Sequence, residues 1–178
     1  VDWYFCPNAI VTGQSSFQAI AMSFNIYGFG TFIGTGFASP FFFFNGCNVN
    51  ITCNKYVNQQ QYYGCIYAQD GSNVNFTSFG EVDCSYNTSI AFDAESNSKI
   101  TINAPIVKCS WGAYNCGTNS EIIANVGKTI LYDIAGDGTS IGNNYAGTFN
   151  NNTNSLIIVN GDLFTEQTID GNTSPLTI

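Results

Sequence analysis

The feature of this sequence that most constrains its fold is a repeat with a period of about 25 residues. Five short segments share the pattern apolar, variable, apolar, and successive copies follow at nearly constant spacing, with the last interval slightly shorter. A second register aligns Val82 with Val107 and Cys84 with Cys109, and it places Val57 one further period before Val82. The five segments of the first register are Phe24-Asn25-Ile26, Val49-Asn50-Ile51, Val74-Asn75-Phe76, Ile100-Thr101-Ile102 and Ile122-Ile123-Ala124.

A third register repeats in phase with the first, in Gly71-Ser72-Asn73, Asn97-Ser98-Lys99 and Asn119-Ser120-Glu121. Short alternating segments separated by Gly, Asn and Ser predict stacked coils, in which each strand pairs with its equivalent one coil along. Leucine-rich, ankyrin and tetratricopeptide repeats need Leu frameworks or helices, which this sequence lacks. A β-sandwich is the alternative, although it would not keep a fixed offset.

We therefore predict an all-β, single-domain, right-handed parallel β-helix with coils of about 25 residues, the hand following the preference of parallel crossovers. Residues 15–160 form the predicted β-helix. Residues 1–14 are interpreted as an N-terminal cap or association segment, and residues 161–178 as a strand-like tail. No uninterrupted apolar run approaches the length of a membrane-spanning helix, so no membrane span is expected.

In period and pattern, residues 15–160 resemble the right-handed parallel β-helix (pectin-lyase-like) superfamily. Members of that superfamily include polysaccharide lyases and hydrolases, viral tailspikes, adhesins and surface fibres, so the resemblance implies a fold and leaves the function open. Its lyases commonly use arginine as the proton acceptor, and its hydrolases use clustered aspartates with basic partners. This chain has four lysines and neither arginine nor histidine. We interpret it as a non-catalytic member.

Alternation along the repeat sends Asn25, Asn50, Asn75 and Thr101 outward as a ladder. Asn50 and Asn75 are also acceptors in N-x-[S/T] glycosylation motifs. Either the ladder carries glycans or its amides hydrogen-bond to one another along the stack, and the sequence leaves both open. The predicted glycosylation sites are Asn50, Asn75, Asn87, Asn151 and Asn172.

Seven cysteines without a CxxC pair favour an oxidising, secretory environment and therefore a secreted or cell-surface protein. Cys84 and Cys109 are predicted at equivalent inward positions on neighbouring coils, where they form either a disulfide or a ladder of thiols. An odd number leaves at least one cysteine free or bonded to another chain, and Cys6 is our candidate for that role. The remaining disulfide candidates are Cys47, Cys53, Cys65 and Cys116.

The net charge of −8 excludes most nucleic-acid binding, because a phosphate-binding surface needs a basic patch. The absence of histidine removes the Ser-His-Asp and Cys-His systems and histidine zinc sites. The acidic pairs Glu81/Asp83 and Asp93/Glu95 are interpreted as solvated or ion-paired surface acids, with Asp83 paired across coils to Lys108. No catalytic residue, cofactor or metal site is predicted.

In the run Phe41-Phe42-Phe43-Phe44, strict alternation would turn about half of the rings outward, which indicates either packing into the core or a cap, or a contact surface. With no capping helix evident at either end, the leading hypothesis is a secreted, N-glycosylated structural protein that self-associates end to end into an extracellular fibre, coat or surface layer. Its partners would be copies of itself and glycans. The alternatives are a polysaccharide-degrading enzyme, with Asp83 and Asp93 as its candidates, and a carbohydrate-binding adhesin that uses Tyr62, Tyr63, Tyr86 and Trp111.

Overall fold

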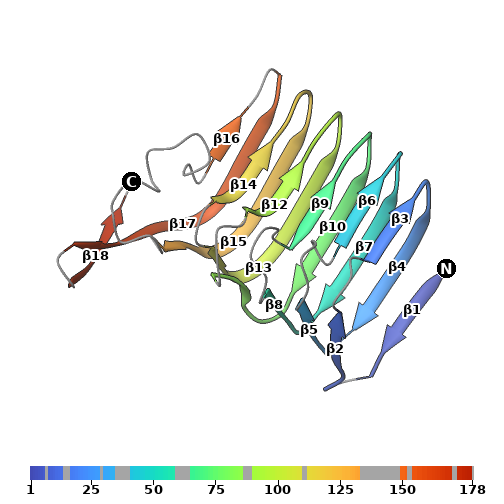
Figure 1. The fold of residues 1–178 in the computed structure, drawn as a ribbon, viewed down its shortest axis with the longest axis horizontal. Helices are drawn as coiled ribbons and strands as arrows, with labels where there is room; N and C mark the ends of the chain where they lie inside the picture. The colour runs from blue at the N-terminus through green and yellow to red at the C-terminus, as the bar shows by residue number, and fades with distance from the viewer. Residues whose placement is uncertain are drawn as a thin grey trace.

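The computed structural model describes eleven stretches of the chain and confirms the predicted all-β architecture, in which parallel strands stack as a β-solenoid (Figure 1). No helix occurs in these stretches, and so none that could cross a membrane. The stretches are residues 1–6, 8–13, 17–28, 30–34, 41–58, 65–85, 90–109, 112–132, 149–151, 154–169 and 172–177.

The strands form three columns along the solenoid axis. The first column is β1 (Asp2–Phe5), β4 (Ser23–Gly28), β7 (Asn48–Cys53) and β10 (Asn73–Ser78), followed by the first halves of β13 (Lys99–Cys109), β15 (Glu121–Tyr132) and β17 (Leu156–Ile169). The second is β2 (Ile10–Gly13), β5 (Thr31–Gly34), β8 (Lys55–Asn58) and β11 (Val82–Cys84), followed by the second halves of the same three long strands.

The third column is a separate six-stranded sheet, to which each successive coil contributes one strand. Its members are β3 (Phe17–Ile20), β6 (Phe41–Phe44), β9 (Ile66–Ala68), β12 (Ile90–Ala94), β14 (Gly112–Cys116) and β16 (Phe149–Asn151). All pairs within the three columns are parallel. The last strand, β18 (Asn172–Thr177), differs because it pairs antiparallel with the end of β17.

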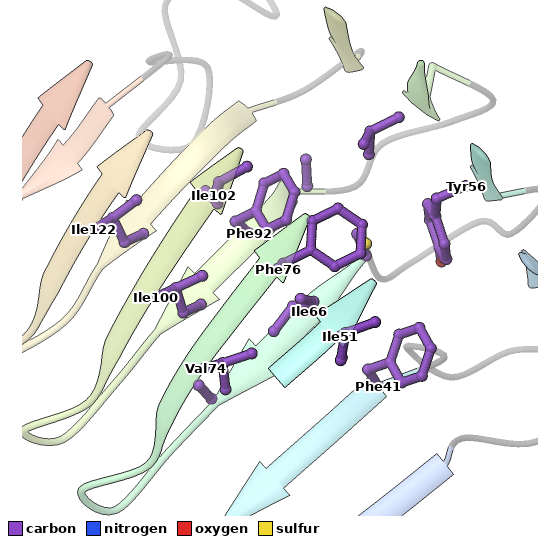
Figure 2. Close-up of a cluster of buried hydrophobic side chains, with 14 of the residues drawn as sticks. Phe41, Ile51, Tyr56, Ile66, Val74, Phe76, Phe92, Ile100, Ile102 and Ile122 are labelled. Carbon is purple, nitrogen blue, oxygen red and sulfur yellow. The ribbon is translucent and has the colours of Figure 1, made fainter. Parts of the chain in front are cut away.

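The core follows the first sequence register. Val74 pairs with Val49 and Ile100, and Phe76 pairs with Ile51 and Ile102, so equivalent apolar side chains stack from coil to coil. Figure 2 shows these side chains directed into the interior, where Phe76 meets Phe92 of the third column at a ring separation of 5.7 Å. Full burial of each such side chain stabilises the fold by about 1.5–3 kcal/mol.

The third register marks a turn that recurs where the third column passes into the first. At this turn two consecutive residues have positive φ, as in Asn45-Gly46 and Asp70-Gly71. Asn, Asp and Gly are the residues that adopt this conformation most readily. After the turn, the Ser72 amide donates to the Ser98 hydroxyl at 3.1 Å, and the Ser98 amide donates to the Ser120 hydroxyl at 3.2 Å. These three buried serines are referred to below as the serine ladder.

One detail of the predicted register is wrong. Val82 pairs with Tyr56 rather than with Val57, so the buried residue in that coil is Tyr56. The difference arises at the links between these strands, because three residues separate Ser78 from Val82 whereas only two separate the equivalent Cys53 from Tyr56. In the phenylalanine run, Phe41 and Phe43 are buried core residues, while the side chains of Phe42 and Phe44 lie outside the description.

Candidate functional site

The predicted outward ladder exists, and its amides are joined. The Asn25 amide donates to the Asp2 carboxylate at 2.6 Å, the Asn50 amide to the Asn25 oxygen at 2.7 Å, and the Asn75 amide to the Asn50 oxygen at 2.9 Å. Asn50 and Asn75 are exposed, as their register predicts. Each bond uses one of the two N–H groups of a side-chain amide, so the ladder and an attached glycan are chemically compatible at these two residues.

Two further amide ladders were not predicted. Asn160 donates to Asn125 at 2.9 Å, and Asn125 donates to Asn103 at 3.0 Å, along the outer face of the first column. A third ladder joins Asn154, Asn119 and Asn97 at the turn that precedes this column. The sequence signal for the first of these ladders is the asparagine that follows each of the triplets at residues 100–102 and 122–124.

The other three predicted glycosylation sites have no described side chain. Asn151 ends β16 and Asn172 begins β18, but their side chains lie outside the description. Asn87 lies wholly outside the described residues.

None of the seven cysteines forms a disulfide, so of the two alternatives predicted for Cys84 and Cys109 the structure shows the ladder of buried thiols. Cys84 and Cys109 do pair directly in the parallel register, but parallel stacking directs equivalent side chains the same way rather than toward each other. The Cys109 thiol instead donates to the Ile130 carbonyl oxygen at 3.6 Å. Except for exposed Cys6, the cysteines are buried. They act as small apolar core residues, so the cysteine count no longer argues for an oxidising compartment.

The buried thiols are also chemically protected. Burial raises the pKa of the Cys53 thiol to about 11, against a smaller opposing effect of a hydrogen bond with Ser78, and it raises the pKa of Cys65 and Cys84 well above the ordinary range. Since the thiolate is the nucleophile and the metal ligand, these three thiols are inert near neutral pH.

Glu81 forms the centre of an ion-pair network on the second column. Its carboxylate lies 2.8 Å from the Lys55 ammonium and 2.7 Å from the Lys108 ammonium, and hydrogen bonds from Lys108 and Lys55 lower the Glu81 pKa. Asp83 is in register with Lys108 as predicted, yet it accepts hydrogen bonds from the Ser85 amide and hydroxyl. The predicted Asp83–Lys108 ion pair is therefore replaced by one between Glu81 and Lys108.

Asp93 and Glu95 form a different kind of pair, on the outer face of the third column. The Asn115 amide nitrogen donates to Asp93 Oδ1 at 2.8 Å and to Glu95 Oε1 at 3.1 Å. The described ion pairs engage Glu81 and Glu121, and none engages Asp93 or Glu95. Asp93, Glu95 and Asn115 are called the acid–amide cluster below. Of the predicted alternatives for this pair, ion pairing is not seen among the described residues, and both side chains are partly exposed.

Burial sets the electrostatics of the acid–amide cluster. Asn115 is 6% exposed, and Asp93 and Glu95 are half-buried. Burial, with a smaller contribution from neighbouring Glu95, raises the Asp93 pKa to about 7, against the effect of the Asn115 hydrogen bond. Asn115 Oδ1 is the one buried side-chain polar atom in the described part of the chain that has no hydrogen-bond partner. The cluster thus places two poorly solvated carboxylates beside an amide oxygen that has no hydrogen-bond partner.

The N-terminal end of the solenoid exposes apolar surface. Val1 is 78%, Trp3 42% and Ile10 68% exposed, and Tyr4 stacks on Tyr27 at 5.2 Å. The interior opens there into an apolar cavity of about 320 Å³, lined by Val1, Trp3, Gln18, Ala19, Met22 and Phe24. β1 lies at this end of the ribbon, where its far edge faces away from the other strands (Figure 1).

The opposite end of the first column is the start of β17. Leu156 is 49% and Ile158 38% exposed there, while Ile157 and Val159 pack partly buried against the core. β18 pairs with β17 from Phe164 onward, so no strand of the described residues pairs with the outer edge of this first part of β17. The aromatic residues proposed for sugar binding, Tyr62, Tyr63, Tyr86 and Trp111, lie outside the described residues.

No protein family, curated protein or solved structure matches this chain.

Proposed function

We propose that this protein is a structural β-solenoid that self-associates end to end into an extracellular fibre, coat or surface layer. The observation that carries the proposal is the apolar cavity at the N-terminal end, which leaves the interior of the first coil open beside the exposed Trp3 ring. Apolar surface of this kind marks an interaction site, and an open strand edge is a template for pairing with another chain.

A second copy supplies a complementary surface. Continuing the register of the first column beyond β17 would place Asp2 of the next copy over Ile158 and Trp3 over Val159. The inward position of that row is occupied by Ala124 and Val159 at the C-terminal end, both smaller than Ile26 and Phe76 earlier in the row. Small residues leave room for the indole of an incoming Trp3, and its burial would contribute favourable free energy.

We further propose that the protein is a member of the pectin-lyase-like superfamily, that its coil is right-handed and that it is glycosylated. Exposed Asn50 and Asn75 support the last of these, since a glycosyltransferase needs surface access to its acceptor. Glycans on that face of the first column would hinder lateral contacts and favour growth along the axis. N-glycosylation takes place along the secretory route, so the proposal includes secretion of the protein.

The test is association as a function of protein concentration, measured by sedimentation velocity and by electron microscopy of the unaltered chain. We expect linear assemblies, with Trp3→Glu shifting the population to monomer because it places a charge in the joint. Phe79→Glu is the matched control, since Phe79 is 56% exposed on the side of the solenoid, between β10 and β11. Monomer at every concentration, or equal effects of the two variants, would overturn the proposal.

A further inference from the structure

We infer that the acid–amide cluster of Asp93, Glu95 and Asn115 is a binding site for a hard divalent cation of the calcium class. The site is independent of the proposed assembly, because it lies on β12 and β14 of the third column, whereas the proposed joint is formed by β1 and β17 of the first column.

The first argument is charge. Two carboxylates converge on one amide nitrogen, at 2.8 and 3.1 Å, and the described ion pairs place no ammonium against them. Three of the four lysines form ion pairs with Glu81 or Glu121. Lys128 lies in the second column, where its register neighbours are Ile106 and Asp162. Half-buried carboxylates without a basic partner bind either protons or a metal ion. A divalent cation would neutralise both.

The second argument is the unused oxygen of Asn115. An amide inside a ladder, such as Asn50, is held from both sides, because its nitrogen donates to Asn25 while its oxygen accepts from Asn75. Asn115 donates on one side only, and its oxygen is buried without a partner. A half-turn of this amide breaks its bonds to the two acids and no others. The turn brings a third oxygen toward the point where the two carboxylates converge.

The third argument is the position of Glu95 and the kind of atoms in the cluster. A Cβ atom at Gly117 would overlap Glu95 Oε2, so the glycine lets this carboxylate lie where it does. The two acids and the amide together offer oxygen ligands alone, which is the donor set that Ca²⁺ selects, and water can complete its six to eight ligands. No group of three acidic, histidine or cysteine side chains in the described residues forms a metal site, so the amide oxygen is the necessary third ligand.

The experiment is a titration of the metal-stripped chain with calcium chloride, followed by calorimetry and by thermal unfolding. We expect one site per chain with a Kd of about 10⁻⁴ to 10⁻³ M, the range of extracellular calcium modules. Calcium should raise the melting temperature more at pH 8 than at pH 5, because a bound proton must leave before the metal binds. Terbium chloride gives a second readout, since Tyr67 is the register neighbour of Asp93 and can sensitise terbium emission.

The variants separate a metal site from a general effect of negative charge. Asp93→Asn combined with Glu95→Gln keeps the shape of both side chains and should weaken calcium binding more than about tenfold. Glu81→Gln combined with Asp83→Asn removes an equally spaced acidic pair that contacts lysine and Ser85, and it should leave calcium binding unchanged. Asn115→Asp adds a third carboxylate and should tighten binding. Absence of saturable binding to the unaltered chain at pH 8, or equal binding by the Asp93/Glu95 variant, would overturn the inference.

Discussion

Removing one hydroxyl from the serine ladder tests how the coils are held together at the turn. In Ser98→Ala, the Ser72 amide loses the oxygen to which it donates at 3.1 Å. Ser72 and Ser98 are buried at 0% and 1% exposure, so water does not replace that acceptor. A buried donor left without a partner costs about 1–3 kcal/mol. Because a domain of 150–250 residues loses about 2–4 °C of melting temperature per kcal/mol, the expected decrease is roughly 2–12 °C.

The assay is urea unfolding, accompanied by hydrogen exchange of the Ser72 amide, which should lose protection in the variant. Ser23→Ala is the matched control, because Ser23 is exposed and its stability effect should lie within about 0.5 kcal/mol. Adding Ser120→Ala removes the acceptor of the Ser98 amide as well, so the double variant should be less stable than Ser98→Ala. Equal stability of the Ser98 and Ser23 variants, with the Ser72 amide still protected, would refute this account of the ladder.

Three other outcomes are expected. A thiol reagent should modify one cysteine per chain quickly, the exposed Cys6, and the others only after unfolding; rapid modification of several would contradict the buried thiols. The raised Asp93 pKa of about 7 means that the folded chain holds a proton that the unfolded chain loses near pH 4, so stability in a metal chelator should fall between about pH 4 and 7 and then level off. Asp93→Asn should flatten this urea-midpoint profile, and an unchanged slope would contradict the assignment. Asp2→Asn should increase association in sedimentation velocity, because it removes a charge from the edge strand β1; weaker association would show that the edge is not the joint.

The first column could be predicted from sequence because its strands keep nearly constant spacing. Val49, Val74 and Ile100 occupy equivalent places on successive coils, and their alternation with polar residues determines which side chains face inward. The same regularity placed Asn50 and Asn75 on the surface. The error at Val57 arose because one more residue lies between Ser78 and Val82 than between Cys53 and Tyr56, and a shift of one residue moves a strand side chain to the other face.

The acid–amide cluster could not be found in this way. Asp93 and Asn115 are 22 residues apart, which is shorter than the usual period, and they lie in the third column. The repeat that is visible in the sequence lies in strands of the first two columns. The partner of Lys108 was equally inaccessible, because register placed it beside Asp83 while the longer side chain of Glu81 reaches both Lys55 and Lys108. Register determines neighbouring backbones, and side-chain length then determines which charged groups meet.

The amide ladders give the solenoid an internal direction. In each of them the nitrogen donates toward the preceding coil, from Asn75 to Asn50, from Asn160 to Asn125 and from Asn154 to Asn119. Reversing one interior amide would set oxygen against oxygen on one side and nitrogen against nitrogen on the other, so neighbouring amides behave as a row of coupled two-state rotors that reorient as a block. In the ladder of Asn25, Asn50 and Asn75 the Asp2 carboxylate can only accept, so it fixes the shared orientation, and a perturbation at that end is felt by amides that never contact Asp2.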